Sequence, residues 1–262
     1  MKDVMMMPNF FVTSDIHSAY TPLKKALNEK GFDSNNENHW LIVCGDCFDR
    51  MDESGEVLNY LMSLKRKILI RGNHDLLLRD LCERGFPYRY DFHNGTTTTV
   101  YDLGDAGSGN DFEKCCEVTQ NKLKKYNDLL VNYFETEHFI FCHSWIPTIS
   151  QNGGYYKYDK NWRNATNNQW ELAMWGNPFE LADLELNQTG KTIVFGHFHT
   201  SYQWSAHYGY SEFDKDAKFE PYYGHNYIGL DACVARTEKV NVIVIEDEFM
   251  HMEGKYGDSS TN

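Results

Sequence analysis

Short runs of apolar residues recur along the chain, and each run stops at polar or small residues. The runs rich in Val, Ile and Phe are residues 10–12, 40–44, 68–70, 139–142, 192–195, 227–230 and 240–245. Within most of these runs the apolar residues are consecutive rather than alternating, which is typical of strands covered on both faces. The chain therefore predicts strands that are buried inside a layered structure.

Stretches with helical spacing lie between the early runs. The predicted helices are residues 22–30, 54–65, 75–83 and, in two parts, 112–134. Pro22 suits the first helical position after Thr21 as the N-cap, and Gly31 stands where a helix-ending glycine belongs. Strands alternate with helices in the first half, and the second half is richer in strands. This order predicts an α/β fold, a layered β-sandwich flanked by helices in an αββα arrangement.

Two segments interrupt the pattern. Residues 86–110 contain Gly, Asn and four consecutive Thr at 96–99 without a clear period, and residues 151–187 are polar and aromatic. We expect each to be a surface loop or a cap over a site. We also expect one domain over residues 1–253, with 151–187 as an insertion, and a small polar tail at 254–262 that frays.

Composition narrows the class of protein. The chain has 262 residues, a formal net charge of -13, 41% hydrophobic and 24% charged residues, which argues against bulk disorder, collagen and coiled coil. No stretch approaches the roughly 18 consecutive apolar residues that a membrane helix needs, and residues 1–10 lack the apolar core of a signal peptide. We therefore expect a cytoplasmic protein with no membrane partner. The acidic balance argues against general nucleic-acid binding, which needs a basic surface.

Polar residues follow five of the predicted strands, at the point where each strand ends. The clusters are Asp15 and His17 in Ser-Asp-Ile-His, Gly45-Asp46-Cys47-Phe48-Asp49-Arg50, Arg71-Gly72-Asn73-His74-Asp75, His143, and Gly196-His197-Phe198-His199. The carboxyl ends of parallel strands gather at one edge of an α/β sheet, where such proteins place their sites. Carboxylates, imidazoles and an amide oxygen are ligands for divalent cations. A glycine before a ligand lets the chain approach closely.

Each cluster has a plainer explanation when it is taken alone. An Asp-x-His pair is common by chance, Gly-Asn-His-Asp can form a turn, and a single residue such as His143 is often a hydrogen-bonded histidine beneath a strand end. Their order along the chain, each after a predicted strand, is what indicates a metal site.

The combination resembles the calcineurin-like metallophosphoesterase superfamily. That pattern is Asp-x-His, Gly-Asp-x-x-Asp-Arg, Gly-Asn-His-(Glu/Asp), a single His and Gly-His-x-His, and it spans residues 13–199 here. The Asp-Arg and Arg-Gly-Asn-His forms point to the serine/threonine phosphatase-like branch. That branch includes bacterial and phage phosphatases and the diadenosine tetraphosphatases.

The resemblance implies a centre of two divalent metal ions, with Mn²⁺ expected and Fe or Zn²⁺ as alternatives. The ligands implied for one ion are Asp15, His17, Asp46 and His199. Those implied for the other are Asp46, Asn73, His143 and His197, so that Asp46 bridges the pair. Two such ions, less two carboxylates and one hydroxide, leave a local charge of roughly +1. That charge would attract phosphate to an acidic protein.

The resemblance also implies a hydrolytic mechanism. A bridging hydroxide attacks phosphorus in line, and no phosphoenzyme forms. His74 protonates the leaving oxygen as general acid, and Asp49 orients it, a contribution that is typically about 10²–10⁴-fold. Arg50 holds the phosphate oxygens through its guanidinium fork. Arg71 either assists in substrate binding or forms a structural ion pair.

The chain departs from the family pattern at several positions. Met51 stands where this branch usually has Gly, and His199 is a second His that its protein phosphatases lack. Those phosphatases also carry a further phosphate-binding Arg between the regions of His143 and His197, where the only Arg is Arg163, outside the motif. The segment 175–178 resembles the Trp-Ser-Asp-Pro segment of the branch. Asp231 resembles a later strand-end Asp of bacterial members, and we do not expect it to bind metal directly.

Several functions remain open from the residues. The main interpretation is a metal-dependent phosphoesterase acting on phosphate monoesters of a small molecule, a nucleotide or a phosphoprotein. An alternative is a hydrolase of dinucleoside polyphosphates, in which the aromatic residues of 151–175 stack on a nucleobase; these residues could equally form a local hydrophobic cluster. A thiol redox protein using Cys44 and Cys47 is a remote alternative, and a non-catalytic scaffold conflicts with the complete ligand set. The seven cysteines predict no disulfide framework, and the sequence indicates no oligomeric state.

Overall fold

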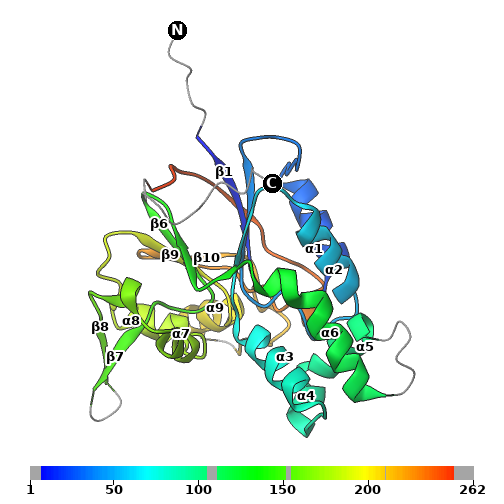
Figure 1. Cartoon of the computed structure of the whole chain (residues 1–262). Coiled ribbons are helices and arrows are strands. Elements are labelled where there is room, and N and C mark those ends of the chain that lie inside the picture. Colours follow the sequence, from blue (N-terminus) through cyan, green and yellow to red (C-terminus); the bar gives the residue numbers. More distant parts are fainter. Residues whose placement is uncertain (1–6, 105–110, 152–154, 210, 251–262) are drawn as a thin grey trace.

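The computed structural model describes residues 7–104, 111–151, 155–209 and 211–250. Within these ranges the protein is an α/β structure with two five-stranded sheets and a two-stranded hairpin. Helices flank the sheets on both outer sides (Figure 1). The predicted layered sandwich is confirmed, whereas the predicted tail at 254–262 lies outside the described residues.

The first sheet has the order β12-β1-β2-β3-β4. Its strands are β1 (Asn9–Thr13), β2 (His39–Cys44), β3 (Lys67–Ile70), β4 (Leu130–Val131) and β12 (Ile243–Glu246). The first four are parallel to one another, and β12 pairs antiparallel with β1. In this register Val12 lies opposite Ile42, and Cys44 lies opposite Ile70. The carboxyl ends of β1, β2 and β3 therefore lie at one edge.

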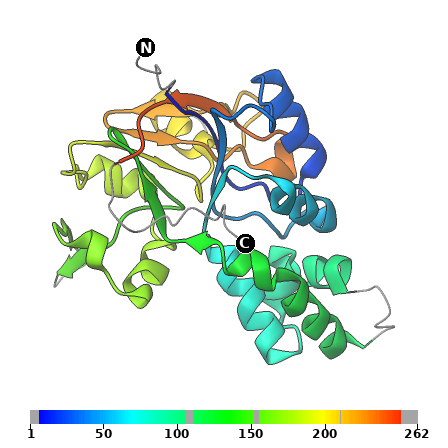
Figure 2. The same ribbon diagram turned by 45° about the horizontal axis from the view of Figure 1, so that its top comes forward.

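Helices pack beside the first sheet and against one another. They are α1 (Tyr20–Glu29), α2 (Ser54–Ser63), α3 (Asn73–Arg84), α4 (Arg89–Asn94), α5 (Thr96–Gly104) and α6 (Phe112–Asn127). Leu23 of α1, Leu61 of α2 and Leu123 of α6 are buried in one cluster with Leu41 of the sheet. Figure 2 shows α3 to α6, in cyan and green, gathered at one end of the sandwich.

The second sheet has the order β10-β11-β9-β6-β5. Its strands are β5 (Tyr133–Glu135), β6 (Phe139–Cys142), β9 (Thr192–Phe195), β10 (Tyr222–Gly224) and β11 (Tyr227–Gly229). The three central strands are parallel, and the two edge strands are antiparallel to their neighbours. The hairpin of β7 (Thr148–Gln151) and β8 (Tyr155–Tyr158) stands apart from both sheets. The elements that remain are η1 (Trp162–Asn164), α7 (Asn167–Ala173), α8 (Pro178–Asp183), α9 (Thr200–Tyr208) and α10 (Val234–Thr237).

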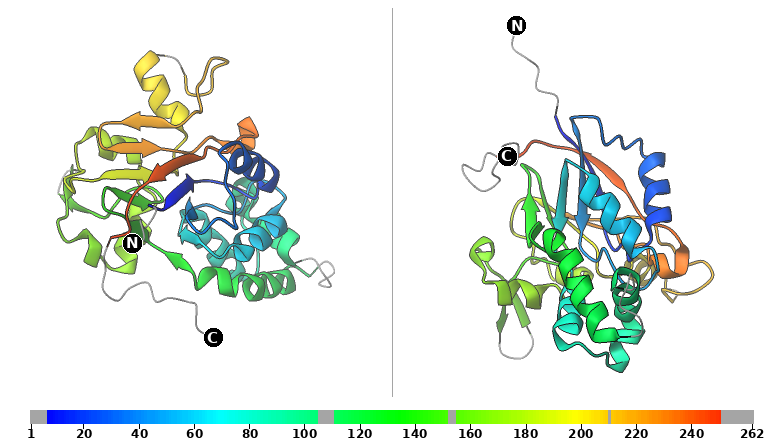
Figure 3. Two further views of the ribbon diagram at one scale, coloured as in Figure 1. Left: turned by 90° about the horizontal axis from the view of Figure 1, so that it is seen from above. Right: turned by 45° about the vertical axis from the view of Figure 1, so that its right-hand side comes forward.

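The inner faces of the two sheets enclose one apolar cluster. Phe10 and Ile42 of the first sheet meet Phe141 and Val194 of the second, and each of these four side chains is fully buried. Burying one such side chain contributes about 1.5–3 kcal/mol relative to leaving it exposed. This cluster holds the two sheets together. Figure 3 (left) shows the strands of both sheets from above.

The predicted two-part helix over 112–134 is wrong in its second half. The helix α6 ends at Asn127, and the next residues form β4, which pairs with β3, and β5, which pairs with β6. Pairing with strands distant in sequence overrides the local preference of a short apolar run. The segment therefore links the two sheets.

Of the two expectations for residues 86–110, the surface loop is wrong for the part that the structure describes, which forms α4 and α5, and the cap over a site stays a prediction. The carboxylate of Asp91 accepts from the Tyr88 backbone (2.6 Å) and from Arg84 (2.6 Å), so it supports the start of α4. Gly95 ends α4 in the left-handed conformation, and α5 follows. The β-branched threonines weaken the helical signal, while tertiary packing of Val100 and Leu103 stabilises the helix. Residues 105–110 are not among those described.

The segment 151–187 contains local structure rather than one loop. Trp162 and Trp170 are buried, and the ring of Trp170 stacks on Tyr133 with centroids 5.2 Å apart. Tyr155 and Trp175 are exposed. The hydrophobic-cluster interpretation therefore accounts for the two buried tryptophans. In the described ranges no helix is long and apolar enough to cross a membrane.

Candidate metal centre

Polar side chains from both sheets meet at the carboxyl ends of the parallel strands. Asp15 follows β1, Asp46 follows β2, and Asn73 begins α3 directly after β3. His143 follows β6 and His197 follows β9 in the other sheet. Each loop leaves its sheet at the same edge, which is where open α/β sheets place ligands.

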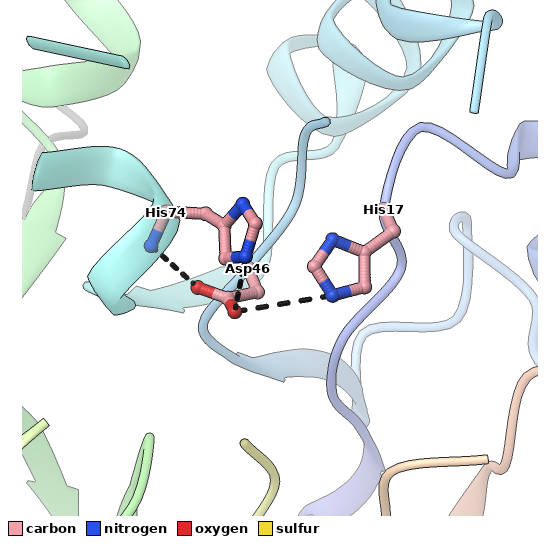
Figure 4. Close-up of side chains that lie close together, drawn as sticks. All are labelled: His17, Asp46 and His74. Atoms are coloured by element: carbon pink, nitrogen blue, oxygen red, sulfur yellow. Dashed lines mark hydrogen bonds and ion pairs between the residues drawn. The ribbon is translucent and has the colours of Figure 1, made fainter. Parts of the chain in front are cut away.

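One group of side chains surrounds Asp46 from the side of the first sheet. The Asp46 Oδ2 atom lies 3.9 Å from Nε2 of His17 and 4.0 Å from Nε2 of His74. All three residues are buried. Figure 4 shows both imidazoles facing this carboxylate.

A second group surrounds Asp46 from the side of the second sheet. Its Oδ1 atom lies 3.4 Å from Nε2 of His143 and accepts a hydrogen bond from the His74 backbone (3.0 Å). The amide oxygen of Asn73 lies 2.7 Å from His143 Nε2 and 2.9 Å from His197 Nδ1. Asp46 is thus shared by two clusters, each suited in its residue types to a metal ion.

Asp15 lies between the groups of the two sheets, in contact with both His197 and His17. Its Oδ2 atom accepts from the His197 backbone at 2.9 Å, and its Oδ1 atom lies 3.9 Å from His17 Nε2. Among the described residues, Oδ1 has no hydrogen-bond partner although it is buried. An unpartnered buried carboxylate oxygen costs free energy unless a cation or a proton approaches it.

Backbone carbonyls orient two of the imidazoles. His17 donates from Nδ1 to the Phe48 carbonyl at 3.0 Å, and His143 donates from Nδ1 to the Cys44 carbonyl at 2.9 Å. Because Nδ1 carries the proton, Nε2 of each ring is an acceptor directed into the site. The close pair of His143 Nε2 and the Asn73 oxygen therefore brings two acceptors together, and this arrangement fits a cation between them.

Two glycines allow this crowding. A Cβ on Gly72 would overlap the Asp46 carboxylate, and a Cβ on Gly196 would overlap the Asp15 carboxylate. Several ligand candidates also hold positive φ angles, including Asp15 at 48°, Asp46 at 50° and His197 at 68°. Non-glycine residues in this region carry strain, which concentrates at functional sites.

Burial and neighbouring charges shift the pKa values of several side chains in the site. Burial and the nearby Asp231 and Asp46 raise the pKa of Asp15. Burial alone would also raise the pKa of Asp46, but the neighbouring imidazoles, His143 first, hold it well below its usual range. Burial lowers the pKa of His197 to about 3. An ionised Asp46 carboxylate and an unprotonated His197 ring are the states that metal ligation requires of these two groups.

The donor set therefore fits divalent metal ions. Carboxylate, imidazole and amide oxygen groups converge on one shared carboxylate, and within the described part of the chain the buried Asp15 Oδ1 lacks a hydrogen-bond partner. Such a mixed oxygen and nitrogen set suits borderline divalent cations.

A histidine and an arginine stand beside the ligand candidates. His74 donates from Nδ1 to Asp49 Oδ2 at 2.7 Å, while its Nε2 lies 3.5 Å from a guanidinium nitrogen of Arg50. His74 and Asp49 are buried. Burial alone would lower the pKa of His74, but Asp46 and the hydrogen bond to Asp49 raise it above the ordinary value.

Three other sequence candidates lie less centrally. His199 is in neither cluster among the described residues; its Nε2 lies 3.9 Å from Asp231 and its side chain is 32% exposed. Arg71 donates to Asn132 at 3.5 Å. Arg163 is paired with Glu135 through two hydrogen bonds, 2.8 and 2.5 Å long, so its guanidinium is occupied by a carboxylate.

The structure adds residues that the sequence reasoning did not assign to the site. Asp231 is buried close enough to Asp15 to raise its pKa. Thr96 and Thr99 bond to Asp49. The position of Asp231 after a strand was a usable signal, whereas nothing in a run of four threonines indicates which hydroxyls point inward.

The remaining departures have simple structural settings. Met51, which replaces a family glycine, has no positive φ, whereas Asp49 and Arg50 before it have φ angles of 75° and 65°. Within the described ranges all seven cysteines are free. Burial raises the pKa of the Cys44 and Cys47 thiols, which is opposite to what a reactive thiol needs.

The chain is similar to known proteins in sequence. The family model for calcineurin-like phosphoesterases matches residues 8–228. The chain is similar to the symmetrical bis(5'-nucleosyl)-tetraphosphatases of Proteus mirabilis, at 39% identity over 69 residues, and of Pseudomonas fluorescens, at 38% identity over 69 residues. These alignments cover 26% of this chain and 24% of each relative, so the chain spans about a quarter of the length of the curated relatives it matches.

A solved structure extends the comparison over most of the chain. The cold-active protein-tyrosine phosphatase of a psychrophilic Shewanella aligns with a TM-score of 0.50 at 17% identity. That alignment covers 92% of this chain and 76% of that chain. At this identity the likeness concerns the fold.

Proposed function

The chain belongs to the calcineurin-like phosphoesterase family, and on that premise we propose that it hydrolyses phosphate monoesters at the centre around Asp46. The observation that carries the proposal is that imidazoles from both sheets, His17 on one side and His143 on the other, converge on this one carboxylate. A shared carboxylate is what two divalent ions about 3.5–4 Å apart need.

We assign the ligands as the family pattern distributes them. Asp15, His17, Asp46 and His199 would hold one ion, and Asp46, Asn73, His143 and His197 would hold the other. For this, the His199 side chain would have to move from its position beside Asp231 toward the two clusters. When bound, the two ions supply charge neutralisation at the phosphoryl oxygens and lower the pKa of a water molecule. Mn²⁺ is our first choice, with Fe and Zn²⁺ as alternatives.

The protein's own side chains would then handle the leaving group and the phosphate. As a water oxygen bonds to phosphorus and the ester P–O bond breaks, the electron pair of that bond would go to the leaving oxygen, which would take a proton from Nε2 of His74. Asp49 fixes the ring through the 2.7 Å bond to Nδ1. The exposed Arg50, adjacent to His74, would donate to the phosphoryl oxygens. Arg71, whose hydrogen bond to Asn132 is 3.5 Å long, would bind a more distant anionic part of a substrate.

Dinucleoside polyphosphates are the second candidate substrate class. The curated relatives carry that name, although the match covers a quarter of their length. The half-exposed ring of Trp175 lies 6.5 Å from the His197 ring, close enough to the centre to contact a nucleobase. Trp162 and Trp170 are buried and so are unavailable for stacking.

A substrate panel with elemental analysis tests the proposal. We expect 4-nitrophenyl phosphate to be hydrolysed with Mn²⁺ present, and Asp46→Asn to lose both bound metal and activity. His74→Asn should keep its metal while turnover falls about 10²–10⁴-fold, the usual contribution of a general acid. Comparing 4-nitrophenyl phosphate with a phosphopeptide and diadenosine tetraphosphate ranks the substrate classes. Full metal content and activity in Asp46→Asn would refute the proposal.

A further inference from the structure

The first turn of α5 surrounds the carboxylate of Asp49. Thr96 donates from its hydroxyl to Asp49 Oδ2 at 2.9 Å, and Thr99 donates to Oδ1 at 2.8 Å. The Thr99 hydroxyl also accepts from the Asp49 backbone at 2.9 Å. All three residues are fully buried, so these contacts are shielded from competing water.

The same turn also supports the backbone at this point. Asp49 and Arg50 both have positive φ angles, and a Cβ on Gly95 would overlap the Arg50 backbone. A strained pair of residues persists only where the surroundings fix it. The turn that begins at Gly95 thus contacts both the side chain and the main chain of the Asp49–Arg50 loop.

From these contacts we propose that Thr96 and Thr99 are positioning residues for proton transfer, which set the direction of His74 by fixing Asp49. The inference rests on the proposed function, because it assumes that His74 protonates the leaving group. Asp49 Oδ2 accepts from both Thr96 (2.9 Å) and His74 (2.7 Å), so the two donors determine together where that oxygen lies.

Loss of a hydroxyl should affect only reactions that need the proton. In Thr99→Val, Oδ1 of Asp49 loses its donor and the carboxylate can rotate, which misdirects Nε2 of His74. For phenyl phosphate, whose leaving group has a pKa of about 10, we expect kcat to fall about 10- to 100-fold, the range for one charge-assisted hydrogen bond. For 2,4-dinitrophenyl phosphate, whose leaving group needs little protonation, kcat should change less than about 3-fold.

The chain offers matched controls on the same turn. Thr98 is exposed, so Thr98→Val should leave both substrates unaffected. Thr99→Ser restores the hydroxyl and should recover most of the phenyl phosphate rate. Metal content should be unchanged in every threonine variant. In an Asp49→Asn background, Thr99→Val should cost little more, because both substitutions remove the same alignment.

The outcomes separate this inference from the proposed function. Equal losses with both substrates, or full additivity with Asp49→Asn, would overturn the positioning role while leaving hydrolysis in place. If the wild-type protein hydrolyses no aryl phosphate, the proposed function fails and this role fails with it. A further readout is the exchange rate of the His74 Nδ1 proton measured by NMR. We expect faster exchange in Thr99→Val than in Thr98→Val, and equal rates would contradict the proposal.

Discussion

Asp46 belongs to both clusters of the candidate metal centre. It accepts from the His74 backbone and faces imidazoles from both sheets, while Gly72 leaves room for its carboxylate. A larger side chain at Gly72 would displace the group that both clusters share. Single residues of this kind explain why the motif needs glycine next to its ligands.

Glu135 offers a prediction away from the centre. Its carboxylate is 1% exposed and contacts Arg163 at 2.5 Å and Lys191 at 3.0 Å. Burial alone would raise the pKa of Glu135, but hydrogen bonds from these two side chains outweigh it and lower the pKa. We expect Glu135→Gln to cost about 2 kcal/mol of unfolding free energy at neutral pH, a value reduced for the partial exposure of Arg163.

The pH dependence of this loss follows from the lowered pKa. A carboxylate with a depressed folded-state pKa contributes stability above its ordinary pKa and loses it as pH falls through the lowered value. The difference in unfolding free energy between wild type and Glu135→Gln should therefore narrow as the pH falls below the ordinary glutamate pKa of 4.5. Urea unfolding at several pH values measures this difference, and Glu137→Gln at an exposed position is the control. A gap that widens on acidification would refute the assignment.

For single residues, the sequence predicted which side chains converge, but it did not predict which hydrogen bonds orient them. Asp15, Asp46, Asn73, His143 and His197 follow strand ends, so their convergence could be anticipated from topology. The acceptor direction of each imidazole depends on carbonyls such as that of Cys44, which no sequence pattern reveals. That Asp231 does not bind metal directly stays a prediction.

Among the elements, isolated strands were predictable and linking segments were not. The strands β6 and β9 have the predicted bounds because each is a buried apolar run bounded by polar residues. The strands β4 and β5 are too short for periodicity to distinguish them from the end of α6. Their pairing with strands of two different sheets decides their structure.

The junction of α4 and α5 gives a prediction at this scale. Gly95 has a φ of 77°, and a Cβ there would overlap the Arg50 backbone. Gly31 has a φ of 79° with open space around its missing Cβ. Gly31→Ala should therefore cost only the left-handed strain of about 1–2 kcal/mol. Gly95→Ala should cost about 2–4 kcal/mol, because overpacking adds to that strain.

The two variants also differ in their expected effect on catalysis. Displacing Arg50 should lower kcat in Gly95→Ala under conditions where the protein remains folded, whereas Gly31→Ala should retain the wild-type rate. Thermal unfolding and phenyl phosphate turnover, measured on the same samples, provide the comparison. Similar losses of stability in both variants would indicate that the loop adapts and that α5 does not fix it.

Over the whole molecule, the site joins the two sheets of the sandwich. Asp15 and Asp46 extend from the first sheet, and His143 and His197 extend from the second. The inner apolar cluster holds the sheets together from within, and metal ions would add a link at the carboxyl edge. The expectation of one domain over residues 1–253 stays a prediction, although a ligand set divided between both sheets favours it.

Metal removal should therefore destabilise the fold as a whole. A ligand that binds only the folded state at about 100 times its Kd adds about 2.7 kcal/mol. For a chain of this size that corresponds to a Tm shift of about 5–10 °C. We expect chelation to lower Tm by this amount and Mn²⁺ to restore it. Asp46→Asn should respond to neither treatment, because the carboxylate shared by both clusters is gone.

A variant of an exposed carboxylate distinguishes the metal-dependent Tm shift from a general effect of removing one negative charge. Asp128 is exposed and pairs with Lys124 at 3.2 Å, outside both clusters, so Asp128→Asn should show the full wild-type shift with Mn²⁺. If the metal stabilised only a local loop, chelation would change the near-ultraviolet signal without moving the cooperative transition. A single transition that moves as a unit in wild type and Asp128→Asn, and stays fixed in Asp46→Asn, is expected because the ligands divide between both halves of the sandwich. A Tm in Asp46→Asn that rises with Mn²⁺ as in wild type would contradict a centre built on that carboxylate.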